Sequence, residues 1–239
     1  DTRGLWRKNT LNPESNVQFG EGGAGAFSDG KLNFIHKLGK TDLTQFMETS
    51  EAVRLIDETE DIYNRFGMDG KVFPTDMEKA KEIRKQARKQ GIELLIIRQK
   101  HLGSDNLPGH IAAMADYVRD RGVTFHHSEE VREVVVEGGA VTGVVTNRGS
   151  YEAANVILAP GRVGAEWIGG VARSHGIEVS QRGIEVGVRV EVHNEIMEDL
   201  CSIIYDPTFF VRTTKYDDQT RTFCTNFGGY VALENYQDF

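Results

Sequence analysis

The chain has 239 residues, of which 39% are hydrophobic and 27% charged, proportions that are typical of an ordinary globular protein. It carries 28 basic and 36 acidic residues, a formal net charge of −8, and this negative field argues against partners such as nucleic acid or an anionic membrane. No stretch reaches the roughly 20 consecutive apolar residues that a membrane-spanning helix requires.

The first hundred residues predict a glycine-rich loop followed by helices. Glycine is dense over residues 20–31, where it allows positive φ angles and a close approach of the backbone to a ligand. Apolar residues recur at helical spacing over residues 40–91, and Thr75 with Glu78 forms a capping box that opens a helix ending at Gly91. A buried strand is expected over residues 92–97.

The middle of the chain predicts a helix and then mostly strands. A polar turn at residues 101–105 precedes a helix over residues 108–121 and a short strand over residues 123–125. Residues 131–151 read as a three-stranded β-meander with glycine-containing turns. Residues 155–159 form an apolar run that indicates a buried strand ending at Pro160 and Gly161.

The last seventy residues predict further strands. Valine alternates with other residues over 186–192, the pattern of a strand with one buried face. Antiparallel strands are expected over residues 209–213, 220–225 and 230–233. This region is therefore interpreted as part of a second, β-rich domain.

Two phosphate-binding patterns occur in the glycine-rich loop, and we reject both. Gly20, Gly22 and Gly25 match the dinucleotide fingerprint, but no buried strand precedes them and a turn follows. The segment 25–31 resembles a P-loop, but Leu32 stands where a Ser or Thr would bind Mg²⁺. A nucleotide triphosphatase is therefore disfavoured.

Four segments of the chain resemble a family of uncharacterised FAD-dependent dehydrogenases within the glutathione-reductase-like FAD/NAD(P)-binding superfamily. Residues 11–32 closely resemble the family signature, and residues 101–105 resemble its His-x-Gly-Thr-Asp turn with Ser104 in place of Thr. Residues 156–161 are similar to the superfamily's strand-ending Ala-Thr-Gly motif, and residues 186–191 to its Val-Gly-x-Arg strand. The family begins with a strand and a true fingerprint and continues past Phe239, so we expect this chain to be an internal fragment.

The resemblance implies an α/β fold with part of an FAD/NAD(P)-binding domain, including its β-meander, and a β-rich substrate domain. The expected division is a glycine-rich FAD-contacting segment at 1–35, a helical insertion at 36–100, FAD-domain residues at 101–168 and an incomplete substrate (cap) domain at 169–239. FAD is the implied cofactor. The residues that the resemblance places against FAD are Gly22, Gly23, Ala24, Gly25, Ser28, Lys31, Val131, Ala159, Pro160 and Gly161. Among them, the resemblance implies that the backbone of Val131 recognises the adenine ring.

Candidate catalytic residues are Lys31, His101, Asp105 and Arg189. A cation such as Lys31 near a flavin stabilises its reduced anionic ring. His101 and Asp105 lie on a turn after a strand, where proton-transfer or substrate-binding groups often gather, although hydrogen bonding within the turn is the favoured explanation. Arg189 is a candidate anion anchor, with a surface ion pair as the simpler alternative.

The cysteine and histidine content bounds the remaining chemistry. Cys201 and Cys224 form neither a disulfide framework nor a CxxC motif, which indicates a reducing cytoplasm, and Cys224 is expected to be a small buried apolar residue. The seven histidines show no metal-ligand spacing, so no metal site is predicted.

Two functions of different classes follow. The first is a fragment of an FAD-dependent oxidoreductase that passes a hydride or electrons between flavin and a small-molecule substrate. The alternative is a non-catalytic domain that binds a small molecule or a protein partner without bound cofactor, because the fingerprint that holds the pyrophosphate is missing. The use of NAD(P)H, a homodimer and the substrate's identity stay open.

Overall fold

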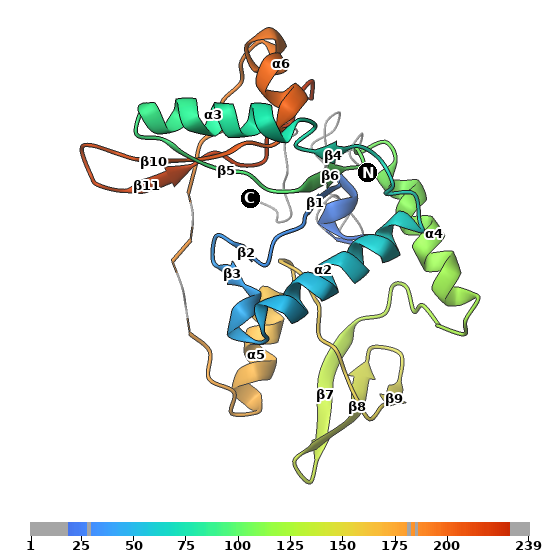
Figure 1. Ribbon diagram of the computed structural model, residues 1–239. Coiled ribbons are helices and arrows are strands. Elements are labelled where there is room, and N and C mark those ends of the chain that lie inside the picture. Colours follow the sequence, from blue (N-terminus) through green and yellow to red (C-terminus); the bar gives the residue numbers. More distant parts are fainter. Residues whose placement is uncertain (1–18, 28–29, 181–182, 185, 230–239) are drawn as a thin grey trace, which may run out of the picture. The chain divides into compact units, whose positions relative to one another are not determined.

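The computed structural model (Figure 1) describes residues 19–27, 30–180, 183–184 and 186–229. Helices and small antiparallel sheets are mixed along the chain, which confirms the α/β class expected from the sequence. Among the described residues two compact units are present, one within residues 19–24 and 115–188 and the other within residues 25–114 and 189–229. The division into four consecutive segments stays a prediction.

The second unit contains a three-stranded sheet in which β6 (Gln99–His101) lies between β1 (Lys31–Asn33) and β4 (Val72–Phe73). Both neighbours run antiparallel to β6, and Lys31 is directly opposite His101. The sheet thus joins the end of the glycine-rich loop to the turn that the sequence singles out.

A second sheet of the same unit pairs β10 (Thr208–Arg212) with β5 (Glu93–Leu95) on one side and β11 (Gln219–Arg221) on the other. Helix α3 (Met77–Lys89) runs alongside it in Figure 1 and packs on β5. The buried core between them consists of Ala80, Leu94 and Ile204. The predicted strand at 92–97 is confirmed, although its paired part is shorter.

Helix α3 begins one residue later than the capping box predicts. Asp76 is its N-cap and accepts a hydrogen bond from the backbone N–H of Lys79, whereas the hydroxyl of Thr75 donates to the carbonyl of Ser202. The prediction of Thr75 as the cap was wrong because a second good capping residue follows it directly. The helix ends as predicted, since Gly91 follows with a φ of +72°.

The other elements of this unit are helices and short strands. Helix α2 (Thr49–Asn64) is the long helix expected in the 40–91 region, and α6 (Asn194–Ile203) lies in the region that the sequence reads as β-rich. The remaining short elements are the 3₁₀ turns η1 (Ala24–Phe27) and η2 (Leu43–Gln45) and the hairpin of β2 (Lys37–Leu38) with β3 (Thr41–Asp42). Helix α4 (Leu107–Arg119) starts in this unit and continues into the other.

The first unit contains the predicted β-meander. Strands β7 (Val131–Glu137), β8 (Ala140–Thr146) and β9 (Ser150–Glu152) pair in that order, all antiparallel. Gly138 and Gly139 both have positive φ angles at the first turn, where such angles are required in a tight hairpin. Helix α5 (Ala165–Ser174) follows the meander and was not predicted.

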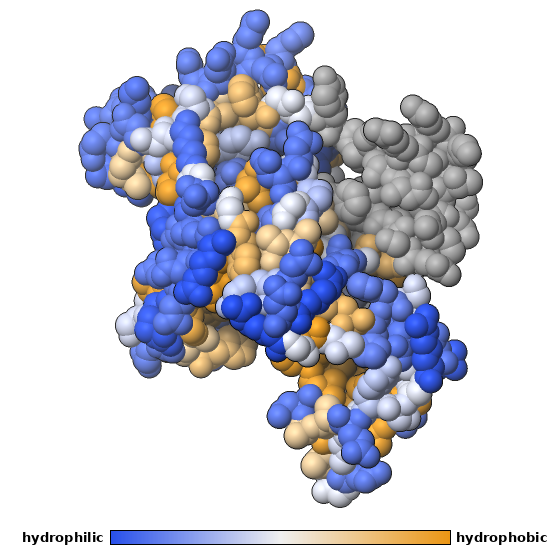
Figure 2. Space-filling model, turned by 90° about the vertical axis from the view of Figure 1, so that its right-hand side faces the viewer, coloured by the Kyte–Doolittle hydropathy of each residue, from blue (hydrophilic) through white to orange (hydrophobic). Residues whose placement is uncertain are grey.

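Three predicted strands do not form. Residues 123–125, 155–159 and 186–192 lie outside any helix or strand. A strand requires a neighbour for its backbone hydrogen bonds, and the apolar side chains of these segments are open to solvent: Ile157 is 93% exposed and Val188 88%. Figure 2 shows that orange, hydrophobic side chains gather at several places on the face that it presents.

The predicted strand at 230–233 lies outside the described residues. Within the residues that the structure describes, no helix combines the length and hydrophobicity needed to cross a membrane.

Candidate functional site

The strands β1 and β6 bring two candidate catalytic residues together. Lys31 and His101 are register partners, and two residues further along Asn33 is opposite Gln99. Residues two apart on a strand share a face, so these four polar side chains lie on one side of the sheet. The side-chain amide of Gln99, which is 1% exposed, donates a hydrogen bond of 2.8 Å to Oδ1 of Asn33.

Asp206 completes this cluster and was not identified from the sequence. Its carboxylate is 3% exposed and forms an ion pair with the ammonium group of Lys31, while its other oxygen accepts a 2.9 Å hydrogen bond from the backbone N–H of Thr225. A buried carboxylate is tolerated only with such partners. The segment after α6 is thereby fixed against the end of the glycine-rich loop.

The ring of His101 is packed between aromatic side chains. Its centroid lies 3.9 Å from that of Tyr205, and Phe73 meets it edge-on at 5.9 Å. Nε2 of His101 is a buried atom. The imidazole therefore has a fixed orientation, which a group that transfers protons needs.

The other two candidate catalytic residues lie elsewhere. Asp105 lies in the exposed turn that leads into α4, and the strand register that pairs Lys31 with His101 does not include it. Arg189 is exposed in an extended segment, and its guanidinium donates a 3.3 Å hydrogen bond to the carbonyl of Cys224. Cys224 is itself exposed, so the expectation of a buried residue was wrong, because no described element covers the segment after β11.

The glycine-rich loop has the backbone shape that a close-approach site needs. Gly20, Gly22 and Gly23 have φ angles of +110°, +86° and +61°, and the N–H of Gly23 bonds to the carbonyl of Gly20 at 2.9 Å. The four-residue turn η1 follows rather than an α-helix, in keeping with the rejection of the dinucleotide fingerprint. Ser28 lies outside the described residues.

Open space surrounds this loop. A Cβ atom built at Gly23 or Gly25 would meet no heavy atom within 4 Å, and the same is true at Gly161, whose φ is +65°. At each of these positions a group could lie directly against the backbone. Ala159 and Pro160 precede Gly161 in a segment without regular structure.

Glu21 connects this loop to the segment that leads into β7. One oxygen of its carboxylate forms an ion pair with the guanidinium of Arg119 at 2.9 Å. The other carboxylate oxygen lies 3.1 Å from Nε2 of His127. Val131, four residues after His127, is the first residue of β7. Two of the predicted FAD-contacting segments are thus joined through one carboxylate.

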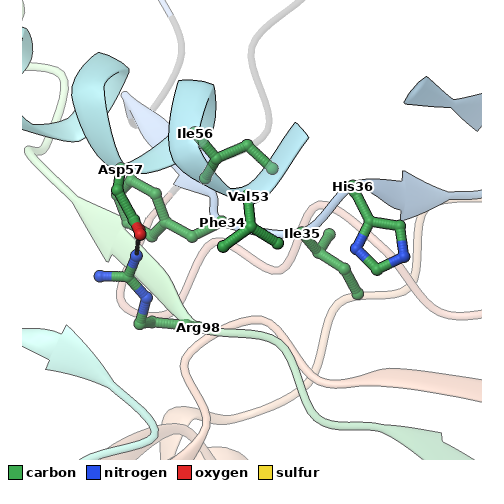
Figure 3. Close-up of a pocket in the computed structure, with 7 residues that line it drawn as sticks. All are labelled: Phe34, Ile35, His36, Val53, Ile56, Asp57 and Arg98. Atoms are coloured by element: carbon green, nitrogen blue, oxygen red, sulfur yellow. Dashed lines mark hydrogen bonds and ion pairs between the residues drawn. The ribbon is translucent and has the colours of Figure 1, made fainter. Parts of the chain in front are cut away.

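A separate pocket of about 230 Å³ lies beside helix α2 (Figure 3). Its lining residues are Phe34, Ile35, His36, Val53, Ile56, Asp57 and Arg98. The guanidinium of Arg98 lies 4.3 Å from the Phe34 ring centroid and donates to Asp57 at 2.9 Å. Since Arg98 also forms an ion pair with Glu60, its charge is compensated, and the pocket offers no unneutralised cation to an anionic ligand.

In the described part of the chain, no group of three or more His, Cys, Asp or Glu side chains is arranged to hold a metal ion.

The comparison with family models supports a cofactor. Residues 98–211 match the family described as FAD binding domain, a stretch that begins at β6 and ends in β10. The match supports an FAD-binding family. It confirms the resemblance stated from the sequence and supports FAD as the cofactor.

Two further similarities were found. A protein of Clostridium beijerinckii (strain ATCC 51743 / NCIMB 8052), described as uncharacterized, is 24% identical over 193 residues, which cover 81% of this chain and 29% of the relative. The chain thus spans less than a third of that relative. The crystal structure of L-proline dehydrogenase from P. horikoshii shares 22% identity, covering 56% of this chain and 33% of that chain, with a TM-score of 0.27, too low to support an argument.

Proposed function

We propose that the chain is part of an FAD-dependent oxidoreductase, a dehydrogenase that exchanges a hydride or electrons with a small-molecule substrate. The observation that carries the proposal is the match of residues 98–211 to the FAD binding domain family. The open space at Gly23, Gly25 and Gly161 allows the proposed contacts, because each of these glycines leaves room for a ligand against the backbone.

We assign the FAD contacts to the segments that the sequence resemblance indicates. These residues are Gly22, Gly23, Ala24, Gly25, Ser28, Lys31, Val131, Ala159, Pro160 and Gly161. When bound, FAD supplies the acceptor for a hydride or an electron pair. The chain's own residues bind it and handle the protons.

His101 is the best candidate for proton transfer. Its imidazole is oriented by Tyr205 and Phe73, and histidine is the side chain whose ordinary pKa lies nearest to neutral pH. Lys31, opposite it, is neutralised by Asp206, so the pair acts as an oriented hydrogen-bond donor rather than as a net positive charge. Asp105 and Arg189 remain proposed as substrate contacts.

The direct test is a visible absorption spectrum of the chain titrated with FAD. We expect a perturbed flavin band and saturable binding, with a further perturbation in His101→Asn relative to the wild type. Failure to bind FAD, both in this chain and in the full-length protein, would refute the proposal and leave the non-catalytic binding domain. Substrate identity, use of NAD(P)H and dimerisation then require separate assays.

A further inference from the structure

The segment that leads into β7 is held by a buried carboxylate. The side chain of Glu129 is 4% exposed, although it lies in a loop. One of its oxygens accepts hydrogen bonds from the hydroxyl of Thr146 at 2.6 Å and from the hydroxyl of Tyr151 at 2.9 Å. Its other oxygen lies 3.1 Å from Nδ1 of His126.

These contacts leave Glu129 charged and fully engaged. The hydrogen bond from Thr146 holds the pKa of Glu129 below its ordinary value, with a further contribution from Tyr151, although burial opposes the shift. Both carboxylate oxygens already have partners, so the group does not serve as a direct ligand contact. Its effect is on the position of the backbone around it.

The neighbouring residue is fixed in the same way. The backbone N–H of Glu130 donates to the side-chain oxygen of Asn147 at 3.0 Å, and the carbonyl of Glu130 accepts from the N–H of Asn147 at 3.0 Å. Residues 129 and 130 are thus tied to the end of β8 and the turn that follows it. Side-chain contacts of this kind hold a loop that has no sheet ladder of its own.

The ladder itself is irregular at this point. Val131 pairs with Thr146, but the register shifts between Val131 and Glu133, the arrangement of a β-bulge. At a bulge one residue is left out of regular pairing, so the backbone needs other restraints. Glu129 supplies them, since it contacts Thr146, the partner of Val131, and Tyr151 on the next strand.

We propose that Glu129 is a positioning residue for FAD. Through its hydrogen bonds with Thr146 and Tyr151, Glu129 fixes the backbone of Val131 in the position in which it contacts the adenine ring. The inference rests on the proposed function, in which Val131 contacts FAD. It adds a residue that makes no ligand contact itself. The same loop carries His127, which contacts Glu21 of the glycine-rich loop, so displacement of residues 126–131 also affects that loop.

The test measures ADP binding, because ADP carries the adenine and the pyrophosphate without the flavin ring. Calorimetric titrations of ADP compare the wild-type chain with Glu129→Ala, Glu129→Gln and Tyr151→Phe. Glu130→Gln is the matched control, since it removes a charge from the adjacent residue, whose side chain is 72% exposed. Thermal unfolding without ligand is recorded for each protein, and the ADP affinities are compared at a temperature below the unfolding transition of every variant.

We expect Glu129→Ala to weaken ADP binding at least tenfold, Glu129→Gln and Tyr151→Phe by a few-fold, and Glu130→Gln not at all. Partial rescue by Gln supports a hydrogen-bonded positioning role, which lower thermal stability alone would not produce. If Glu129→Ala does not fold, the Gln and Phe variants decide the question in the same way.

Unchanged ADP affinity in the Glu129 and Tyr151 variants, with normal binding by the wild type, overturns this inference alone. Binding of FAD but not of ADP by the wild type also overturns the inference, because the contacts with the adenine then contribute too little to the affinity for FAD. Binding of neither ligand, both by this chain and by the full-length protein, overturns the inference together with the proposed function.

Discussion

Lys31 and Asp206 are 175 positions apart in the chain, and their side chains form an ion pair in which the carboxylate is almost completely buried. The pair fixes the first strand after the glycine-rich loop to the segment that follows α6. Because Lys31 is also opposite His101, the same contact sets the surroundings of the proposed proton-transfer residue.

Removal of either charge of this pair should be strongly destabilising. A buried ion that loses its partner costs about 3–5 kcal/mol, so Lys31→Met and Asp206→Asn are each expected to lower the free energy of unfolding by about that amount. The double variant should recover part of the loss, since it leaves no isolated charge. Urea unfolding of all four proteins measures the coupling.

The matched control is Lys81→Met, because Lys81 pairs with Glu78 on the surface and their side chains are 50% and 82% exposed. It should cost less than about 1 kcal/mol. Strictly additive effects at Lys31 and Asp206 would contradict the ion pair.

Elements with strong local signals were predictable from the sequence. The β-meander was found because Gly138 and Gly139 fit its first turn, and the end of α3 because Gly91 follows it. The pairing of Lys31 with Asp206 was not predictable, since nothing local to either residue specifies a partner so distant in the chain. Only the three-dimensional arrangement shows that Lys31 and His101 lie opposite each other on adjacent strands.

The errors have physical causes. Valine alternation over 186–192 satisfies the strand pattern, but no described neighbouring strand supplies hydrogen bonds. Helix α6 was missed although Ile196, Leu200 and Ile203 follow helical spacing, because the surrounding region was interpreted as β-rich.

The stability of the sheet that carries His101 should depend on pH through Glu60. Burial opposes ionisation, but hydrogen bonds from Lys100 and Arg98 lower the pKa of Glu60 from its ordinary value of 4.5. A lowered pKa stabilises the folded state above pH 4.5, and this contribution is lost as the pH falls below it. We expect Glu60→Gln to be less stable than the wild type at neutral pH, with a difference that shrinks in acid.

Denaturant unfolding across the acidic range measures this effect. Glu78→Gln serves as the control, since its side chain is 82% exposed and should leave the profile close to that of the wild type. A constant difference between Glu60→Gln and the wild type at every pH would contradict the proposed linkage.

The two cysteines should differ sharply in reactivity. Burial, together with the nearby carboxylate of Asp206, raises the pKa of Cys201 to about 11, whereas Cys224 is exposed. The thiolate is the reactive form of cysteine. An aromatic disulfide reagent at mildly alkaline pH should therefore modify Cys224 quickly and Cys201 only when the protein unfolds. Cys224→Ser should remove the fast phase and Cys201→Ser should retain it; two fast thiols in the native protein would show that Cys201 is accessible.

The glycine-rich loop offers a test of FAD binding that separates binding from folding. Gly25 and Gly70 both have φ angles that any residue adopts, and a Cβ at either position would meet nothing within 4 Å. Gly25→Ala and Gly70→Ala should therefore leave the free energy of unfolding unchanged or raise it by up to about 1 kcal/mol.

We expect Gly25→Ala, and more strongly Gly25→Val, to weaken FAD binding at least tenfold, because the added carbon atoms occupy the space where the cofactor approaches the backbone. Gly70→Ala, outside the proposed site, should bind FAD like the wild type. Equal FAD affinity in all three variants would show that the cofactor does not contact this loop, and the FAD contacts would then have to be sought at Val131 and Gly161.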